Sequence, residues 1–320
     1  MLSALLALIG AVVYGSADFL GGLAARRLRS IVVTAVAAVA GLAGLGLVQP
    51  LVGGRWTTGD VGWGVVGGLI SVVGIALLYA CLAIGPMSIL SPLTAVVSAV
   101  APMLWGLLVK GDALKPVGYA GLAVALVAVV LVGFIPGERI VRPHARGLAM
   151  ATGAGLAIGA FLIVIDQTSV DSGLVPLVVS RATSGIVTVA VVAVLALLAL
   201  RRGRPARSVL EPGGARVGAT PSGRADLEHA AAGVDASAQR RPRGAAWWWA
   251  VGCGIADAAA NVLMLLALRA GDLAIVSALT ALYPAGTILL AAVVLRERVA
   301  RVQWVGLALA LTAGGMLAVA

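Results

Sequence analysis

Long apolar runs fill most of this chain, and short polar connections separate them. A helix needs about 20 apolar residues to cross the roughly 30 Å hydrocarbon core of a bilayer. Lipid cannot satisfy backbone N–H and C=O groups, so each run is expected to be helical. Ten segments have this length: 2–23, 31–52, 61–84, 87–109, 116–135, 147–167, 174–200, 245–268, 273–295 and 302–320. The pattern therefore predicts an all-α integral membrane protein with ten transmembrane helices.

The composition indicates that lipid is the main solvent of this chain. Hydrophobic residues make up 61% of it, charged residues make up 11%, and the mean hydropathy is +1.07. Soluble domains carry about a quarter charged residues. The net charge of +10 does not indicate nucleic-acid binding, because the cations lie between apolar blocks and form no stripe with aromatic residues. Cys81 and Cys253 both lie inside apolar segments, so no disulfide framework is expected.

Residues 201–244 differ from the rest of the chain, with nine arginines, four acids and many Gly, Pro, Ala and Ser residues. Such a segment cannot bury enough apolar surface to become ordered, so it is predicted to be a disordered loop. Connections on its side of the membrane hold 18 lysines and arginines, whereas the opposite connections hold only Arg55, Lys110, Lys115 and Arg269. The positive-inside rule predicts that the long loop is cytoplasmic and that both termini lie outside.

An internal repeat relates the two halves of the chain. Residues 82–95 and 268–281 align at a constant offset of 186, with Leu, Gly, Ile, Ser, Leu, Thr and Ala at matching positions. The coincident Gly, Ser and Thr are the informative ones, since Leu and Ala are common in any membrane helix. Five helices is an odd number, so the second copy must enter the membrane inverted. We predict that residues 1–135 and 147–320 are inverted five-helix repeats, which is an architecture that supports alternating access.

Short motifs in three places are similar to those of one carrier family. They are Tyr14-Gly15-Ser16-Ala17-Asp18-Phe19, Pro176 with Arg181, and Leu295-Arg296-Glu297-Arg298 followed by Gln303-Trp304-Val305-Gly306. With them the chain resembles the EamA family of the drug/metabolite transporter superfamily. The resemblance implies a ten-helix carrier, export rather than import, and cytoplasmic termini, which is opposite to the charge bias. The chain departs from the family pattern at residues 33–36, which lack an arginine, and at Gly111-Asp112, where a glutamate is expected.

Asp257 is the first candidate for chemistry, because it lies near the middle of the predicted helix 245–268. A charged carboxylate at that depth costs about 2.5–3.5 kcal/mol on insertion scales. Asn261 shares its face one turn later, and Ser71 occupies the matching position in the first repeat. Two interpretations stay open: a substrate or proton site, and a protonated Asp257 bonded across a helix interface. For Asp18 the alternatives are a role in the pathway and an interfacial ion pair with the cations that follow its helix.

Arg181 and two series of hydroxyl-bearing residues complete the candidate site. Arg181 lies about two turns into its predicted helix, where it would act either as a structural anchor or as a counter-ion for substrate or a carboxylate. The two series are Ser88, Ser91 and Thr94 in the first repeat and Ser277, Thr280 and Tyr283 in the second. A spacing of three residues places each series on one side of a helix, which favours a polar stripe along a pathway. The alternative is that the hydroxyls bond to carbonyls of the preceding turn.

Several kinds of site are missing from the sequence. It has no Gly-Lys-Ser/Thr segment for ATP, no His/Cys/Asp/Glu cluster for a metal, and no Ser/His/Asp arrangement on facing helices. We therefore predict no enzymatic activity and no cofactor. The predicted function is a secondary transporter, exporting small metabolites or drugs across the plasma (inner) membrane by alternating access, with protons as candidate coupling ion. The alternative is a non-transporting membrane protein, either a sensor or a lipid-modifying enzyme with acids or histidines clustered near an interface.

Overall fold

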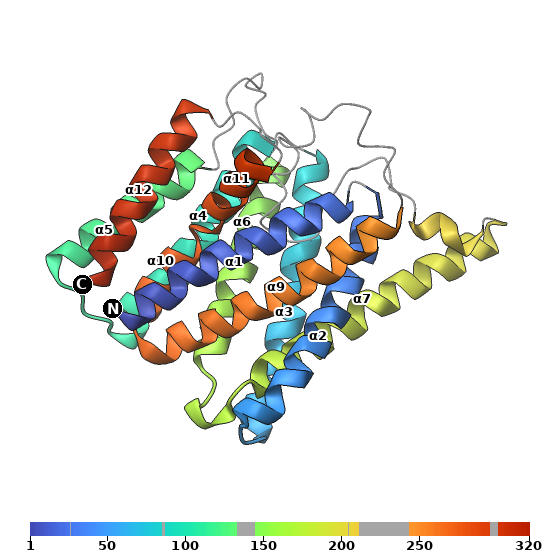
Figure 1. Cartoon of the computed structure of the whole chain (residues 1–320), viewed down its shortest axis with the longest axis horizontal. Helices are drawn as coiled ribbons and strands as arrows, with labels where there is room; N and C mark the ends of the chain where they lie inside the picture. The colour runs from blue at the N-terminus through green and yellow to red at the C-terminus, as the bar shows by residue number, and fades with distance from the viewer. Residues whose placement is uncertain (26, 85–86, 133–144, 204, 211–242, 295–299) are drawn as a thin grey trace.

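The computed structural model describes residues 1–25, 27–84, 87–132, 145–203, 205–210, 243–294 and 300–320, which form a helical bundle (Figure 1). Its long helices are α1 (Leu2–Ala25), α2 (Ser30–Val52), α3 (Thr58–Ile84), α4 (Met87–Trp105), α5 (Pro116–Val132), α6 (Ala145–Asp166), α7 (Val175–Arg201), α9 (Arg243–Ala270), α10 (Leu273–Thr280), α11 (Tyr283–Val294) and α12 (Arg301–Ala318). Within the described residues nine spans are long and apolar enough to cross a membrane, and α5 is a shorter apolar helix of 17 residues. The prediction of an all-α protein with long apolar helices is confirmed.

Two of the predicted helices contain breaks that their hydropathy does not reveal. The predicted segment 273–295 consists of two helices, α10 and α11, with a turn at Ala281 between them. Pro284 lies just after this turn, and proline has no N–H to continue the hydrogen bonds of a preceding helix. Four residues after Pro102, α4 passes into a π-helical turn, η1 (Gly106–Lys110). Proline and π-turns are common causes of bends in long helices.

The connection between α7 and α9 is only partly described. Its first residues include a short 3₁₀ helix, η3 (Ala206–Leu210), which packs on α7. The Leu210 carbonyl accepts a hydrogen bond of 3.1 Å from the Arg29 N–H, so this helix also reaches the beginning of α2. Residues 211–242 of the predicted disordered loop lie outside the described residues.

The helices gather into two sets, and each set contains helices from both halves of the chain. In the first, called the α1 set, α1 packs on α9, α10 and α11, and α2 packs on α9. In the second, called the α3 set, α6 packs on α3 and α4, and α7 packs on α3. The two sets meet where α2 contacts α7 and where α10 contacts α4. The remaining helices, α5 and α12, lie side by side along one edge of the bundle (Figure 1).

Glycines bring helices from different halves into backbone contact. A Cβ atom on Gly68 of α3 would lie 2.6 Å from the carbonyl oxygen of Ser180 in α7, and one on Gly254 of α9 would lie 2.7 Å from the Cα atom of Ala37 in α2. Small residues allow this close approach of helices in membranes. Gly68 and Gly254 are separated by 186 residues, the offset of the sequence repeat. Each of them therefore contacts the second helix of the other half.

The two ends of the bundle differ in charge. Residues 53–57, 111–115, 167–174 and 271–272 connect helices at the end where both termini lie (Figure 1). We call this the sparse end, because its side-chain cations among the described residues are Arg55 and Lys115 in these connections and Lys110 and Arg269 in the helix ends beside them. The helix ends that flank the arginine-rich segments of the sequence lie at the other end, here called the cation-rich end (Figure 1).

Candidate functional site

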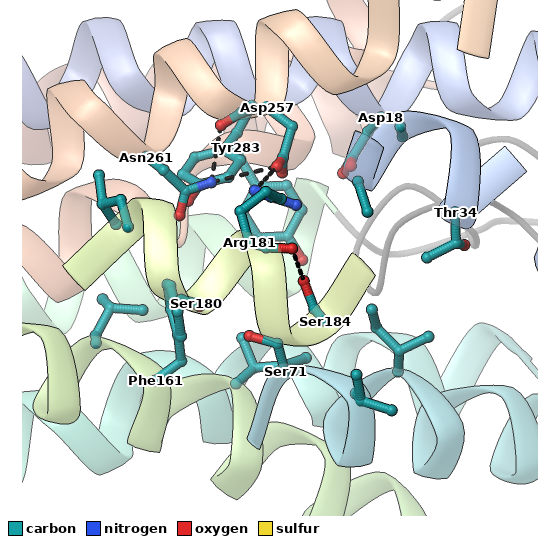
Figure 2. A pocket seen from close by; sticks show the side chains of 18 of the residues that line it. Asp18, Thr34, Ser71, Phe161, Ser180, Arg181, Ser184, Asp257, Asn261 and Tyr283 are labelled. Atoms are coloured by element: carbon teal, nitrogen blue, oxygen red, sulfur yellow. Dashed lines mark hydrogen bonds and ion pairs between the residues drawn. The ribbon is translucent and has the colours of Figure 1, made fainter. Parts of the chain in front are cut away.

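A cavity of about 170 Å³ lies between the α1 set and the α3 set. Its wall comes from α1, α2, α9, α10 and α11 on one side and from α3, α4, α6 and α7 on the other (Figure 2). A single buried water needs about 10–15 Å³ of such space, so the cavity has room for a small molecule. Because the cavity lies between the two sets, any movement of one set against the other changes its shape.

An ion pair crosses the cavity between the two sets. The Arg181 guanidinium, on α7, donates through Nη2 to the Oδ2 atom of Asp257, on α9 (Figure 2). Their side chains are 21% and 15% exposed, so the pair lies on the cavity wall without being sealed from it. The Asn261 amide also donates to Asp257, to its backbone carbonyl at 2.8 Å and to Oδ2 at 3.3 Å. This bond holds the carboxylate in position against α9.

Asp18 brings a second carboxylate to the cavity wall. It lies on α1, is only 1% exposed, and lines the cavity beside Asp257 (Figure 2). One turn earlier on the same helix, Tyr14 also lines the cavity, and its hydroxyl lies 3.9 Å from the Met264 sulfur. The sequence left open whether Asp18 is an interfacial residue or part of a pathway, and the structure places it at the cavity. The wall therefore carries two carboxyl groups and one guanidinium.

The predicted hydroxyl residues of the second repeat all line the cavity together with Ser71. Ser71 and Ser277 donate to carbonyls of their own helices, to Gly67 at 2.9 Å and to Ala274 at 3.0 Å. These are the local bonds that the alternative interpretation expects. Thr280 differs, because its buried Oγ1 has no hydrogen-bond partner within the described residues.

The predicted residues of helix α4 lie elsewhere. The Thr94 hydroxyl donates to the Leu90 carbonyl at 3.0 Å and to the Ala151 carbonyl at 3.1 Å, so it links α4 to α6. Thr94 is not among the residues that line the cavity. The side chains of Ser88 and Ser91 lie outside the part of the chain that the structure describes. From this helix, Ser98 lines the cavity instead.

Sequence reasoning missed a row of hydroxyls on α7. Ser180, Ser184 and Thr188 line the cavity together with Arg181. Their spacing of four residues places them on one helix face, so the sequence contained a signal that could have found them. The cavity wall also includes further residues that the sequence did not single out as site residues: Tyr14, Thr34, Ser98, Phe161 and Cys253. No group of three or more His, Cys, Asp or Glu residues in the described ranges could hold a metal ion.

Comparisons with known proteins support the resemblance seen in the sequence. Residues 233–318 match the model of the EamA-like transporter family, which is consistent with the drug/metabolite transporter superfamily. A solved structure described as "Crystal structure of protein" superposes with a TM-score of 0.67 at 15% sequence identity, covering 99% of this chain and 98% of that one. At this identity the likeness shows the fold alone. No curated protein matches the chain.

Proposed function

On the premise that this chain is a membrane transporter of the drug/metabolite type, we propose that it is a secondary carrier that exports small polar metabolites or drugs. One observation carries the proposal: the Arg181–Asp257 ion pair crosses a cavity that lies between two sets of helices. A charged pair inside a membrane protein is expensive, so it is kept where it acts on a substrate or an ion. In this proposal the chain has no enzymatic activity.

The proposed mechanism is alternating access, in which the α1 set rocks against the α3 set. The α1 set combines the first two helices of the first half with later helices of the second half, and the α3 set combines the first two helices of the second half with later helices of the first half. Two halves related by symmetry would pack in this way. The backbone contacts at Gly68 and Gly254, which are related by the repeat offset, support the same symmetry. Both observations favour the inverted repeat, and a central site between repeats is the usual arrangement in such carriers.

The chemistry of the cavity wall favours a substrate that carries a charged group. Among the described residues Asp257 Oδ1 has no hydrogen-bond partner and Arg181 donates only to Asp257, so both groups of the pair keep bonding capacity for a further partner. A guanidinium has five donors, and a carboxylate accepts at both oxygens. A substrate cation would compete with Arg181 for Asp257, whereas a substrate anion would compete with Asp257 for Arg181. Phe161 and Tyr283 supply aromatic surface beside these groups.

The proposal also includes the membrane and the direction of transport. We propose the plasma (inner) membrane, with the cation-rich end inside according to the positive-inside rule. Export then means uptake of substrate at the cation-rich end and release at the sparse end. Asp18 and Asp257 are the two cavity carboxyl groups that a proton gradient would act through.

The test is export from cells that express the chain, measured across a panel of toxic metabolites and cationic dyes. The wild type is expected to raise tolerance to at least one compound, and Asp257→Asn to reduce its efflux rate at least tenfold at equal membrane abundance. Asp166→Asn is the matched control, because Asp166 also pairs with a cation, at 2.7 Å from Lys110, but does not line the cavity. Its efflux rate should stay within about twofold of wild type.

Two results would contradict the proposal. In one, no compound in the panel distinguishes cells with the chain from cells without it. In the other, Asp257→Asn and Asp166→Asn export equally well, which would mean that the cavity charges take no part in transport.

A further inference from the structure

A cluster of polar contacts closes the sparse end between the two sets of helices. Its centre is Asp60, near the beginning of α3. Its Oδ1 accepts from the Ser169 N–H at 2.8 Å, and its Oδ2 accepts from the hydroxyls of Ser169 and Thr57 at 2.7 and 2.6 Å. These bonds fix the connection between α6 and α7 to the beginning of α3. Both elements belong to the α3 set.

Arg269 attaches the other set of helices to this connection. It lies in the last turn of α9, and its Nη2 donates to the Gly173 carbonyl at 2.7 Å, to the Ser172 hydroxyl at 3.1 Å and to the Ser169 carbonyl at 3.3 Å. Because α9 belongs to the α1 set, these three bonds join the two sets. We call Arg269 and its acceptors Ser169, Ser172 and Gly173 the Arg269 cluster.

The Arg269 cluster lies at the sparse end, and the helices that flank it line the cavity. Leu177, which lines the cavity, is only four residues after Gly173, one of the acceptors of Arg269. Leu162 lines the cavity near the other end of the same connection, four residues before the end of α6. The connection held by Arg269 therefore joins the ends of two helices, α6 and α7, that carry cavity-lining leucines.

The bonding of Arg269 is incomplete, which suits a contact that must open. Its Nε atom is buried and has no hydrogen-bond partner within the described residues. A buried donor without an acceptor offsets part of the stability of the bonds beside it. The cluster therefore holds the two sets together less firmly than its three hydrogen bonds alone would.

We propose that Arg269 is a gating residue, which holds the cavity closed at the sparse end and releases the α6–α7 connection when the two sets separate. The inference rests on the proposed transport function, to which it adds the residue that controls release. Substrate that displaces Arg181 from Asp257 removes the link between the sets inside the cavity. The sets are then joined at the sparse end by the Arg269 cluster, by a bond of 3.2 Å from the Ala274 N–H to Asp112, and by the α2–α3 connection, whose Arg55 N–H donates to the Asp171 carbonyl at 2.8 Å.

A second ion pair at the same end provides the control. Lys110 and Asp166 are 2.7 Å apart, but they join η1, which continues α4, to the end of α6. Both elements belong to the α3 set, so this pair does not link the two sets. Lys110→Gln therefore removes a cation of the sparse end without breaking a contact between the two sets.

The experiment measures access to the cavity from the sparse end. Cys81 and Cys253 are replaced by serine, and Ser71→Cys places one thiol on the cavity wall. A membrane-impermeant maleimide is then applied on the side where a C-terminal tag is detected, since the C-terminus lies at the sparse end (Figure 1). Arg269→Gln is expected to raise the labelling rate at least fivefold. Lys110→Gln should leave it unchanged, and Arg269→Lys should give an intermediate rate, because an ammonium cannot reproduce the fork of donors.

The labelling rate decides the inference independently of transport. An unchanged rate in Arg269→Gln and also in the double variant with Asp112→Ala, at wild-type abundance, would overturn it. If Arg269→Gln reaches the membrane poorly, Ser172→Ala removes one acceptor and should still raise the rate about twofold, and no change there would also overturn it. Faster labelling in a protein that exports none of the compounds would support the gate and contradict the proposed function. Normal export with unchanged labelling would contradict the gate alone.

Discussion

Neutralising one partner of the Arg181–Asp257 ion pair is expected to destabilise the protein more than neutralising both. The two side chains are 21% and 15% exposed, so each charge is largely removed from water. Removing one partner of a buried pair costs about 3–5 kcal/mol, because the remaining charge is left without compensation. Since both side chains keep some exposure, we expect the lower end of this range, about 3 kcal/mol. That corresponds to a fall of roughly 6–10 °C in the unfolding temperature.

The assay is thermal unfolding in detergent of four proteins: wild type, Asp257→Asn, Arg181→Gln and the double variant. In the double variant an asparagine faces a glutamine and no charge is left unpaired. Its destabilisation should therefore be smaller than that of either single variant, below about 3 kcal/mol, and well short of the sum of the two single effects. Simple additivity would refute the reasoning, because it would mean that the two side chains do not interact. Export should be lost in all three variants, since the charged groups are absent even where stability recovers.

Three further predictions follow from other parts of the structure. Gly254→Ala should destabilise the protein by about 1–3 kcal/mol, because the added methyl meets the backbone of α2; Gly62→Ala, which meets nothing within 4 Å, should not, and thermal unfolding compares the two. Burial, and after it the nearby carboxylate of Asp112, raises the pKa of Asp272 above the ordinary aspartate pKa of 3.8. Ionised Asp272 therefore destabilises the folded protein as the pH rises above 3.8. Asp272→Asn should therefore raise the unfolding temperature at neutral pH and give no gain at about pH 3.5; an equal gain at both would contradict this. Reporter fusions at Gly213 and after Ala320 should report inside and outside, respectively, if the charge bias sets the orientation, and the reverse result would favour the family expectation.

The apolar spans could be predicted from the sequence because each one reflects a local requirement, the thickness of the bilayer. The break at Ala281 is not visible in the hydropathy, since the residues around it are as apolar as those of a continuous helix, but Pro284 is a sequence signal for it. The sequence predicted Thr94 on the pathway because residues spaced by three lie near one face of a helix over a few turns. Its hydroxyl instead meets the backbone of α6, and which neighbour a helix face meets is a property of the tertiary structure.

Part of the candidate site could also be predicted from the sequence, and part could not. Asp257 could be found from the sequence because a carboxylate in the middle of an apolar segment is costly and therefore informative. Its pairing with Arg181, 76 residues earlier, could not be chosen over a substrate counter-ion or a structural anchor. That choice depends on how α7 and α9 approach each other across the cavity. Ser180, Ser184 and Thr188 were overlooked although their spacing of four residues is visible, because serine and threonine are ordinary residues in membrane helices.

The ion pair across the cavity has a consequence for the synthesis of the protein. Arg181 enters the membrane with α7, but Asp257 is made 76 residues later. At about 5–20 residues per second the arginine is without its partner for about 4–15 s. An arginine costs up to about 2.5–3.5 kcal/mol to insert at the centre of a helix, and the most apolar 18-residue window of α7 has a mean hydropathy of 2.5, the highest among the nine described spans. The valines and leucines of α7 thus offset the cost of its arginine before Asp257 is available. The cavity can form only after α9 has been inserted.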